Sequence, residues 1–556
     1  MRRRFLGLAL ALLPLPACDH AIPNYASPSA LLPTVALADR AAFVDKTSQR
    51  AFLLDPADKS LRPRIVPVGK APIAAVKRNG KNQLLVLSAG DRGSTKDAPV
   101  AAQLQTIDAN PAVDSVVYPL VSSFDTLAQS DDGSIALLYH GSSAQTASSG
   151  ALFDPNQLAI VNLDPPSADS SRTLPNPYSK SIRSFGGVPT GVVFSPAFTF
   201  AGAARILAVV LAPGYVTIFD VNNPDRNEIT VPLSPDNTRT FTPSQVLFDT
   251  DPSHPAIYVR ADGSNDIFQL ALADLGSATL PDNDFHVSLS MLAAGTGPSD
   301  MALFHGVDDA IRLAVLAPGS RSLVVIDPST SSTTSVSLSI PANRMVLFNA
   351  GTPKAPTPLE ARALLVDVSS GSTSVLFAEM KSIETRGTLS VGDQPLTASV
   401  SSILPLVDQG IVVLQMSGKS SATTALTVVD LASRNFNIVA GNPSATSVID
   451  PGNASRPSTQ WSMDANDKRG LYHVSLTAYA GQPPLVISET WLDQTITGIL
   501  PLGQASSDTH RYVFVAQSDP DGIGNVTVLD ADAPDHNSAR TAYGFLLTDY
   551  LERGQP

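Results

Sequence analysis

An apolar segment that ends in an acidic residue recurs along this chain, about every 53 residues. Repeats of this length are typical of a β-propeller, in which four-stranded sheets, the blades, are arranged around a common axis. The sequence therefore predicts an all-β fold of ten blades. The ten segments end at Asp55, Asp108, Asp164, Asp220, Asp274, Asp327, Glu379, Asp430, Glu489 and Asp530.

The repeats occupy residues 39–548, and no linker rich in Pro, Gly or Ser clearly divides them. We therefore expect one large ring, with two smaller rings in tandem as the alternative. The first repeat lacks an evident innermost strand, and the apolar residues 542–547 are suited to supply it. We expect the N- and C-terminal strands to pair in one blade, which would hide sheet edges from aggregation.

Two segments show the repeat unit most clearly. Residues 206–220 (ILAVVLAPGYVTIFD) and 313–327 (LAVLAPGSRSLVVID) each contain two apolar runs separated by Ala-Pro-Gly. Apolar runs of five or six residues bounded by Pro-Gly predict strands that are buried on both faces. A helix of that length would be unusually short and would lack caps.

The strand that follows the acidic residue has a different pattern. Val336, Leu338 and Ile340 alternate with serines, as expected for a strand with one buried and one solvated face. Pro232 and Pro67 fall in corresponding strands. Because proline has no N–H to donate to a neighbouring strand, these positions predict the outer edge of each blade.

Each repeat begins with a recurrent proline before its first apolar strand. The pattern G-x-x-P occurs at Gly69/Pro72, Gly186/Pro189, Gly295/Pro298 and Gly392/Pro395. With polar turns such as Asn79-Gly80 and Asp132-Gly133, and strands that end in Asp, the chain resembles the YVTN-type, lactonase-like β-propeller superfamily over residues 41–548. The repeats are degraded between residues 440 and 510, where the spacing of the acidic residues is irregular.

The repeated acidic residue has a structural explanation. An Asp at the first position of a turn accepts hydrogen bonds from backbone N–H groups, as expected at Asp55-Pro56-Ala57 and Asp327-Pro328-Ser329. The alternative is a ring of carboxylates that binds cations. We favour the turn because it accounts for the spacing by itself.

The composition indicates a large folded body with an acidic surface. The chain has 556 residues, of which 43% are hydrophobic and 16% charged, and its formal net charge is −13. Removal of an N-terminal leader would take away three arginines and leave a charge of −16. Because an acidic surface repels phosphate backbones, nucleic-acid binding is disfavoured.

The N-terminus has the pattern of a bacterial lipoprotein signal. Three arginines at 2–4 precede an apolar run at 5–15 and then Cys18, which is the only cysteine in the chain. The run is too short to span a bilayer, which needs about 20 residues. The resemblance implies that residues 1–17 are a signal peptide and that Cys18 is the lipid attachment site. The alternative is a secreted protein with a chance cysteine.

Lipidation at Cys18 predicts a protein anchored in the cell envelope, facing the periplasm or exterior, with no transmembrane helix in the mature chain. Asp19 resembles an inner-membrane retention signal, although the membrane involved stays open. Residues 18–38 are expected to form the lipidated start and a flexible tether, and residues 549–556 a C-terminal tail. Since no other cysteine is present, packing and ring closure must stabilise the fold.

No residue set predicts catalysis, cofactor binding or metal binding. The histidines show no metal-ligand spacing. Residues 519–525 resemble a calcium loop, but Ile523 occupies a ligand position, so a hairpin is favoured. Gly418-Lys419-Ser420 lacks the upstream glycine of a phosphate loop, and no G-x-S-x-G motif occurs. The histidines are His20, His140, His254, His286, His305, His473, His510 and His536.

Acidic clusters and two tryptophans are further candidates. Asp282 with Asp284, Asp308 with Asp309, and Asp464 with Asn466 and Asp467 are expected to be solvated turns. Trp461 and Trp491 lie in or near the irregular ninth repeat. Their side chains are suited to a recognition surface, but core packing is the favoured interpretation.

These observations give two functional hypotheses. The first is a membrane-anchored binding or interaction scaffold for a protein, cell-wall or polysaccharide partner in the bacterial envelope. The second is a lactonase-like or lyase-like enzyme with acidic and His residues at the channel mouth, with or without a divalent metal. The first is favoured because the sequence contains an anchor signal and no catalytic motif.

Overall fold

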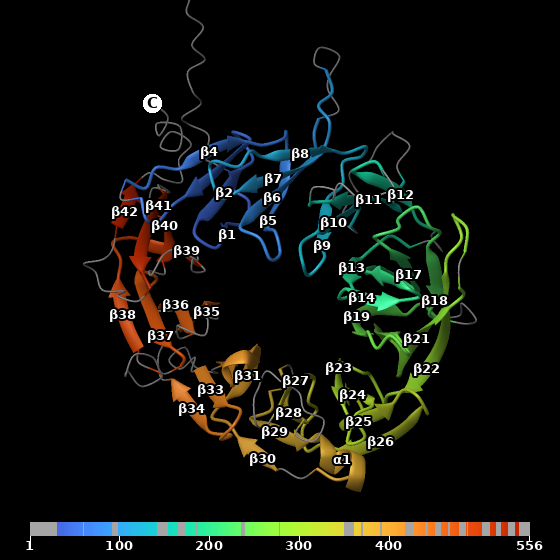
Figure 1. The fold of residues 1–556 in the computed structure, drawn as a ribbon. Helices are drawn as coiled ribbons and strands as arrows, with labels where there is room; N and C mark the ends of the chain where they lie inside the picture. Colours follow the sequence, from blue (N-terminus) through green and yellow to red (C-terminus); the bar gives the residue numbers. More distant parts are fainter. Residues whose placement is uncertain are drawn as a thin grey trace, which may run out of the picture.

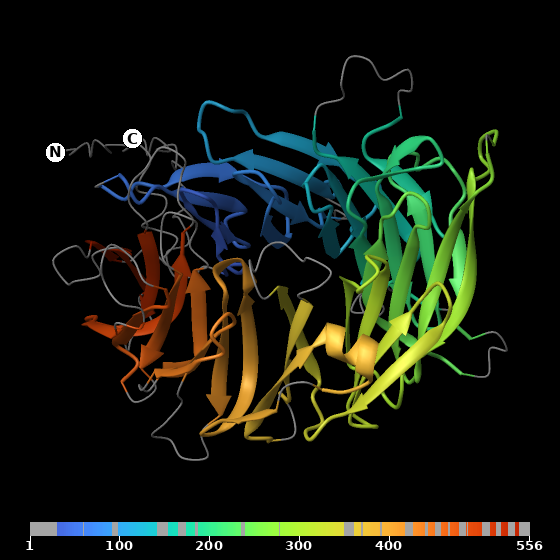
Figure 2. The same ribbon diagram turned by 60° about the horizontal axis from the view of Figure 1, so that its bottom comes forward.

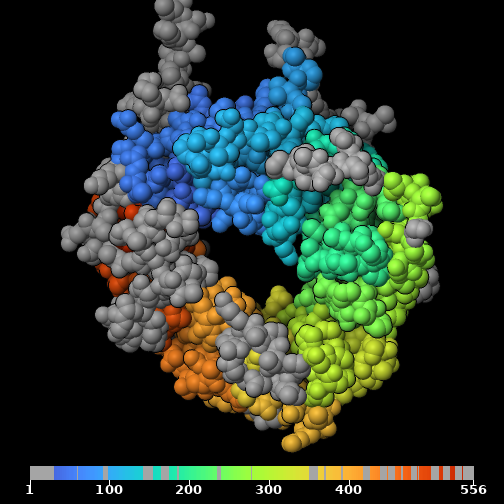
Figure 3. All heavy atoms as spheres, viewed as in Figure 1, coloured from blue at the N-terminus to red at the C-terminus, as the bar shows by residue number. Residues whose placement is uncertain are grey.

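The computed structural model describes most of residues 30–543 and forms a single ring of ten four-stranded antiparallel sheets (Figure 1). The predicted propeller and the single ring are confirmed. Figure 3 shows an open hole along the axis of the ring. Within 30–543, the residues outside the description are 59, 92–97, 142–153, 165–173, 184–186, 235–238, 277, 350–360, 369–370, 390–391, 418–425, 440–442, 451–457, 465–466, 478–484, 486, 503–511, 519–523 and 532–539.

Each of the first five blades places its first strand nearest the axis and its fourth strand outermost (Figure 1). From the axis outward, the strands are β1 (Val35–Ala36), β2 (Ala41–Asp45), β3 (Arg50–Leu54) and β4 (Arg64–Pro67); β5 (Pro72–Lys77), β6 (Gln83–Ser88), β7 (Gln103–Asp108) and β8 (Val116–Pro119); β9 (Thr126–Gln129), β10 (Ile135–Tyr139), β11 (Gln157–Asn162) and β12 (Tyr178–Ser181); β13 (Gly191–Phe194), β16 (Leu207–Ala212), β17 (Tyr215–Asp220) and β18 (Ile229–Pro232); β19 (Thr242–Asp249), β20 (Ala256–Asp262), β21 (Asp266–Asp274) and β22 (Phe285–Ala293).

The last five blades repeat this arrangement and complete the ring (Figures 1 and 2). Their strands are β23 (Asp300–His305), β24 (Ile311–Ala317), β25 (Ser322–Asp327) and β26 (Ser332–Ser337); β27 (Arg344–Asn349), β28 (Ala361–Val366), β29 (Ser374–Glu379) and β30 (Asp393–Pro395); β31 (Ser399–Leu406), β32 (Ile411–Ser417), β33 (Leu426–Asp430) and β34 (Phe436–Val439); β35 (Pro443–Asp450), β36 (Thr459–Asp464), β37 (Gly470–Ser475) and β38 (Ile487–Trp491); β39 (Thr495–Pro501), β40 (Tyr512–Ser518), β41 (Gly524–Asp530) and β42 (Arg540–Tyr543).

The core lies between neighbouring blades and follows the apolar pattern of the sequence. All six residues of β16 and all six of β17 are buried, because the sheet that contains these strands packs against a neighbouring blade on each of its two faces. One apolar cluster joins blades 4 and 5, and another joins blades 6 and 7. The outermost strands are half-exposed, and Pro67 and Pro232 lie exposed on them, as predicted.

The ring closes differently from the expectation. β1 pairs with β2, and β42 pairs with β41, so each terminal blade is built from one continuous segment. The prediction of a blade shared by both termini is wrong, because residues 35–36 supply the first inner strand themselves. Closure comes from side-chain packing: Phe43 and Phe52 of blade 1 share an apolar cluster with Phe514 of blade 10.

The first blade also begins earlier than the predicted boundary at residue 39. Leu32 and Leu37 are buried, and the N–H of Ala30 donates to Oδ1 of Asp45 at 2.9 Å. Residues 30–38 are therefore part of the ring and not of the tether. The remaining predicted tether, the signal peptide, Cys18, Asp19 and the tail at 549–556 lie outside the described residues.

The ninth blade corrects one repeat marker. Its third strand is β37, which ends at Ser475, whereas Glu489 lies in the outermost strand β38. The sequence offered no acidic residue at the end of β37. The acidic marker was therefore assigned one strand too late, which produced the irregular spacing.

Three irregular elements interrupt the described blades. A two-stranded hairpin, β14 (Phe198–Phe200) and β15 (Ala203–Arg205), is inserted between β13 and β16. The helix α1 (Met380–Arg386) follows β29, and the 3₁₀ turn η2 (Val407–Gln409) follows β31. Within the described part of the chain, no helix is both long enough and apolar enough to cross a bilayer.

A candidate ligand-binding cavity

The repeated acidic residues, apart from Glu489, gather on one face of the ring, because they follow the third strands, which all run in the same direction. Their side chains cap the turns that follow. The N–H groups of Ala57, Asn110 and Ser329 donate to Asp55, Asp108 and Asp327, respectively, at 2.8–2.9 Å. The turn interpretation of the repeat is confirmed at these positions.

Three of the repeated aspartates, Asp55, Asp220 and Asp327, also pair with an arginine of their own blade that the sequence analysis missed. Each arginine stands fifteen residues earlier, at or just before the second strand of the same blade. The pairs are Arg40–Asp55 at 3.3 Å, Arg205–Asp220 at 3.1 Å and Arg312–Asp327 at 3.7 Å. The recurrence of Arg at this spacing was the available signal.

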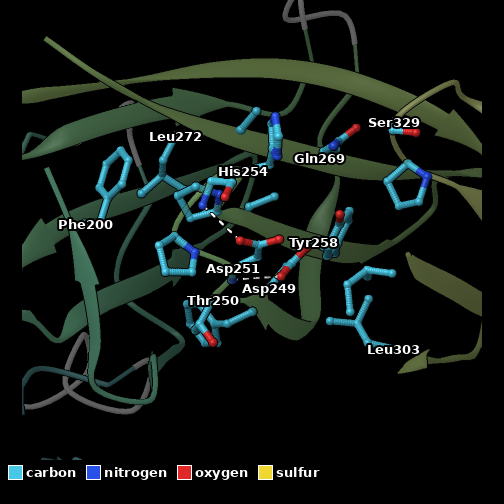
Figure 4. Close-up of a pocket in the computed structure, with 18 of the residues that line it drawn as sticks. Phe200, Asp249, Thr250, Asp251, His254, Tyr258, Gln269, Leu272, Leu303 and Ser329 are labelled. Carbon is cyan, nitrogen blue, oxygen red and sulfur yellow. Dashed lines mark hydrogen bonds between the residues drawn. The ribbon is translucent and has the colours of Figure 1, made fainter. Parts of the chain in front are cut away.

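On the same face, a cavity of about 1360 Å³ opens among blades 4, 5 and 6 (Figure 4). Its centre is the loop between β19 and β20, residues 250–255. The hairpin tip at 200–202 lines one side, and the ends of β23 and β25 contribute residues from blade 6. Three blades thus meet at a single concave site.

The central loop is held by its own turn. Pro252 follows Asp251, the N–H of Ser253 donates to Oδ1 of Asp251 at 2.9 Å, and the N–H of His254 donates to its carbonyl oxygen at 3.1 Å. Asp and Pro at these positions favour a type I turn. The turn fixes Asp251 and His254 as neighbours at the cavity wall (Figure 4).

Asp249, at the end of β19, is a partly buried carboxylate of the cavity lining. Burial raises its pKa, and the negative charge of Asp251 adds to this effect. A hydrogen bond from the N–H of Asp251 and the charges of His305 and His254 oppose it, but the pKa stays above its ordinary value. Asp249 is therefore a carboxylate without a full counter-charge.

His305 and Asp309 lie at the blade 6 side. The Nδ1 atom of His305 lies 3.1 Å from the carbonyl oxygen of Asp309 and 3.3 Å from its Oδ1. Both side chains are solvent-exposed to a large extent. This pair is suited to contact a ligand that enters from solvent.

The walls of the cavity are aromatic. Phe200, Phe248, Phe304 and Tyr258 come from three blades. The Tyr258 side chain is 2% exposed, and within the described residues its hydroxyl makes no hydrogen bond. Burial raises the pKa of Tyr258, and the charges of nearby aspartates raise it further, so this phenol stays protonated.

The charged side chains that line the cavity are acidic. Four carboxylates line the cavity (Asp249, Asp251, Asp274 and Asp309), and the described lining residues include no Lys or Arg. Across the described chain, no three His, Cys, Asp or Glu side chains converge in a way that could hold a metal ion. The cavity has polar groups suited to ligand binding, with no assembled metal centre among these residues.

The histidines of the sequence fall in different places. His254 and His305 meet at the cavity, whereas His286 is exposed on β22. His140 is buried against Phe124 with ring centroids 4.9 Å apart, and burial lowers its pKa despite the charges of nearby aspartates. His473 packs against Trp461, with ring centroids 4.2 Å apart and ring planes tilted by 37°. Outside the described residues lie His20, His510, His536, Gly418, Lys419, Ser420 and residues 519–523.

The two tryptophans differ in burial, and the strands on either side of residues 519–523 pair with each other. Trp461 is fully buried in the core between blades 9 and 10, whereas Trp491 is 47% exposed. Core packing is thus correct for the first and wrong for the second. The strands β40 and β41 pair from Tyr512 to Ser518, which confirms the hairpin around that loop.

The predicted acidic clusters differ in solvent exposure and in their partners. Asp309 is a solvated turn residue, as predicted, and Asp467 is half-exposed beside Arg469. Asp284 is instead part of an ion pair between blades, and Asp464 is buried and accepts a hydrogen bond from the Tyr472 hydroxyl at 2.7 Å. Sequence alone gave no partner for these two. Asn466 lies outside the described residues.

Sequence analysis also missed the hairpin that walls the cavity. Ala201 and Gly202 have positive φ angles of 52° and 72°, which define a type I′ turn. Phe198 and Phe200 pack from the hairpin onto blade 5. The alternating aromatic pair before Ala-Gly, inside an otherwise regular repeat, was the signal for this insertion.

These features define the class of protein: a ten-bladed β-propeller with a cavity on the face that carries the repeated aspartates. No known family model matches the chain, and no curated protein matches it. The assignment to the YVTN-type superfamily therefore stays a prediction, while the propeller fold that it implied is confirmed.

Several solved propeller structures are remotely similar. The dihydro-heme d1 dehydrogenase NirN is 11% identical, with 81% of this chain and 73% of NirN covered and a TM-score of 0.39. AztD of Citrobacter koseri is 10% identical, with 67% and 87% covered and a TM-score of 0.32. A 6-phosphogluconolactonase candidate of Bacteroides fragilis is 13% identical, with 64% and 94% covered and a TM-score of 0.34. Likenesses this remote carry no argument about ligand or activity.

Proposed function

We propose that this protein is a lipid-anchored propeller of the bacterial cell envelope that acts as a binding scaffold. The observation that carries the binding role is the cavity among blades 4, 5 and 6, where polar and aromatic side chains from three blades converge. Large concave sites with a few directed polar groups are the usual places where proteins bind ligands. The ring supplies a rigid support for them.

The anchor rests on the N-terminal sequence. Cys18 follows a basic start and an apolar run, and is the only cysteine in the chain. Because the ring begins at Ala30, the eleven residues at 19–29 allow a separation of at most about 40 Å from the lipid. The propeller would thus be held close to the membrane surface.

Replacement of Cys18 by Ser tests the anchor. The wild-type protein is expected in the membrane fraction after a high-salt wash, and Cys18→Ser in the soluble extracytoplasmic fraction. Ser29→Ala, a neutral change in the same segment, is the matched control and should fractionate like wild type. If Cys18→Ser stays with the membrane in wild-type proportion, the lipid anchor is wrong.

The second candidate is an enzyme, and one observation favours it. Asp249 has a raised pKa and lies in the same cavity as His254, an arrangement suited to general acid–base chemistry. Elemental analysis of the purified protein tests the metal-dependent form of this candidate. A stoichiometric divalent ion, lost in Asp249→Asn, would favour the enzyme over the scaffold.

A further inference from the structure

We propose that the cavity among blades 4, 5 and 6 binds a primary ammonium group carried on an apolar stem. This inference rests on the proposed binding function and names the chemistry of its ligand. A diamine and the side chain of a partner's lysine share this chemistry. The assignment follows from charge, from the walls and from one unsatisfied polar group.

The charge of the cavity selects against anions and favours cations. Asp249 and Asp251 are adjacent carboxylates on the central loop, and the described lining has no Lys or Arg to neutralise them. The other ionisable side chains of the lining are the imidazoles of His254 and His305. A ligand cation would supply the missing counter-charge.

The hydroxyl of Tyr258 is a second polar group at the cavity, independent of the carboxylates. The residue lies in β20, lines the cavity and is almost completely buried (Figure 4). Within the described chain its hydroxyl has no hydrogen-bond partner. An ammonium N–H donated to this oxygen satisfies it.

The walls explain why the cation should be organic. Phe200, Phe248 and Phe304 line the cavity, and aromatic rings attract organic cations. Leu272 and Leu303 complete an apolar surface suited to a methylene chain. A hydrated metal ion would gain nothing from this surface. Three carboxylate or imidazole ligands for a metal do not converge among the described residues.

Titration calorimetry with the full-length protein in a non-ionic detergent tests the proposal. The probe is 1,5-diaminopentane, and the matched neutral probe is 1,5-pentanediol, which has the same stem without charge. A peptide with one central lysine forms the second arm, with the same peptide bearing norleucine as its control. Binding of the diamine indicates a free amine ligand, and binding of the lysine peptide alone indicates a partner's side chain.

Three variants locate the site. Asp249→Asn and Asp251→Asn are each expected to weaken binding at least tenfold, measured with whichever cationic probe binds to the wild-type protein. Tyr258→Phe should weaken it about fivefold, as expected for one hydrogen bond. Asp114→Asn, which removes one exposed carboxylate of blade 2, should bind like wild type. Equal loss in Asp114→Asn would show a general charge effect and overturn the proposal.

Two further outcomes would overturn it. One is absence of binding by both cationic probes, and the other is pentanediol binding as tightly as the diamine. Neither outcome bears on the proposed lipid anchor, because the anchor is tested by a different measurement, the membrane fractionation of Cys18→Ser. Conversely, a failed fractionation test would remove the anchor without changing the titration. The two proposals therefore fail independently.

Discussion

The Nη2 atom of Arg205 lies 2.7 Å from Oδ2 of Asp284, in an ion pair that joins the fourth blade to the fifth. Arg205 is completely buried. Its Nη1 donates to Asp220 at 3.1 Å, and its Nε donates to the carbonyl oxygen of Phe200 at 2.9 Å. The same guanidinium thus holds a turn of blade 4, the hairpin at the cavity and the neighbouring blade.

Replacement of Arg205 by Met should destabilise the protein strongly. Loss of the cation leaves Asp220 buried without its counter-charge, and breaking a buried pair in this way costs about 3–5 kcal/mol. The denaturation midpoint is the measurement. Arg469→Met is the matched control, because Arg469 is 52% exposed beside Asp467 and ion pairs at the surface contribute little to stability. Equal midpoints for both variants would contradict this account.

Replacement of Asp249 by Asn should stabilise the protein at neutral pH. The folded-state pKa of Asp249 is raised by burial and by Asp251, so the ionised carboxylate opposes folding above that pKa. The variant's Tm should exceed that of wild type by roughly one to two degrees at pH 7. The difference should shrink as pH falls through the raised pKa, since wild-type Asp249 then becomes neutral.

Asp327→Asn is a control in which the melting temperature should change in the opposite direction. Burial raises the pKa of Asp327, but hydrogen bonds from Ser329 and the charge of Arg312 outweigh this and lower it. This carboxylate therefore stabilises the fold above its unfolded-state pKa, and the stabilisation is lost as pH falls through the lowered value. Asp327→Asn should melt below wild type at pH 7. Tm shifts of the same sign in both variants would contradict the assigned environments.

Replacement of Phe514 by Ala should weaken ring closure. Phe514 is buried in the cluster that joins blade 10 to blade 1, and truncation of a buried Phe costs about 3–5 kcal/mol. Hydrogen exchange should increase in β2, β3 and β40. Phe124→Ala, in the cluster between blades 2 and 3, should cost a similar amount but increase exchange there. Unchanged exchange at the closing junction in Phe514→Ala would refute closure by packing.

The two tryptophans should differ in fluorescence. Trp491→Phe leaves only the buried Trp461, whose emission should be blue-shifted and resistant to quenching by acrylamide. Trp461→Phe leaves the half-exposed Trp491, whose emission should be red-shifted and readily quenched. Reversed quenching of the two variants would contradict the placement of β36 and β38.

The regular part of the fold could be predicted because its signals are local. Apolar runs such as residues 206–212 have the length and composition of strands that are buried on both faces. Pro232 indicates the edge strand of a blade, because proline has no N–H to donate to a further strand. Asp55 and Asp327 occupy turn positions that their own neighbours explain. The ten blades follow from repetition of these local rules.

The errors occurred where the local signal was absent or ambiguous. The two residues of β1 are too few to show a strand pattern, so ring closure was assigned to the C-terminus. β37 ends at Ser475 without an acidic residue, so the sequence pattern points to the next carboxylate, Glu489, which lies in β38. In both cases the result depends on which strands pair, and the sequence of one strand does not identify the strand with which it pairs.

By itself, the sequence determined that this chain forms ten blades in a ring, because strand length, burial and turns depend on residues close together in the chain. Only the tertiary structure decided that Asp249, Tyr258, His305 and Phe200 meet at one cavity. These residues come from three successive blades, and their proximity depends on how the sheets pack around the axis. The hairpin β14–β15 and the ion pair of Arg205 with Asp284 are likewise set by that packing.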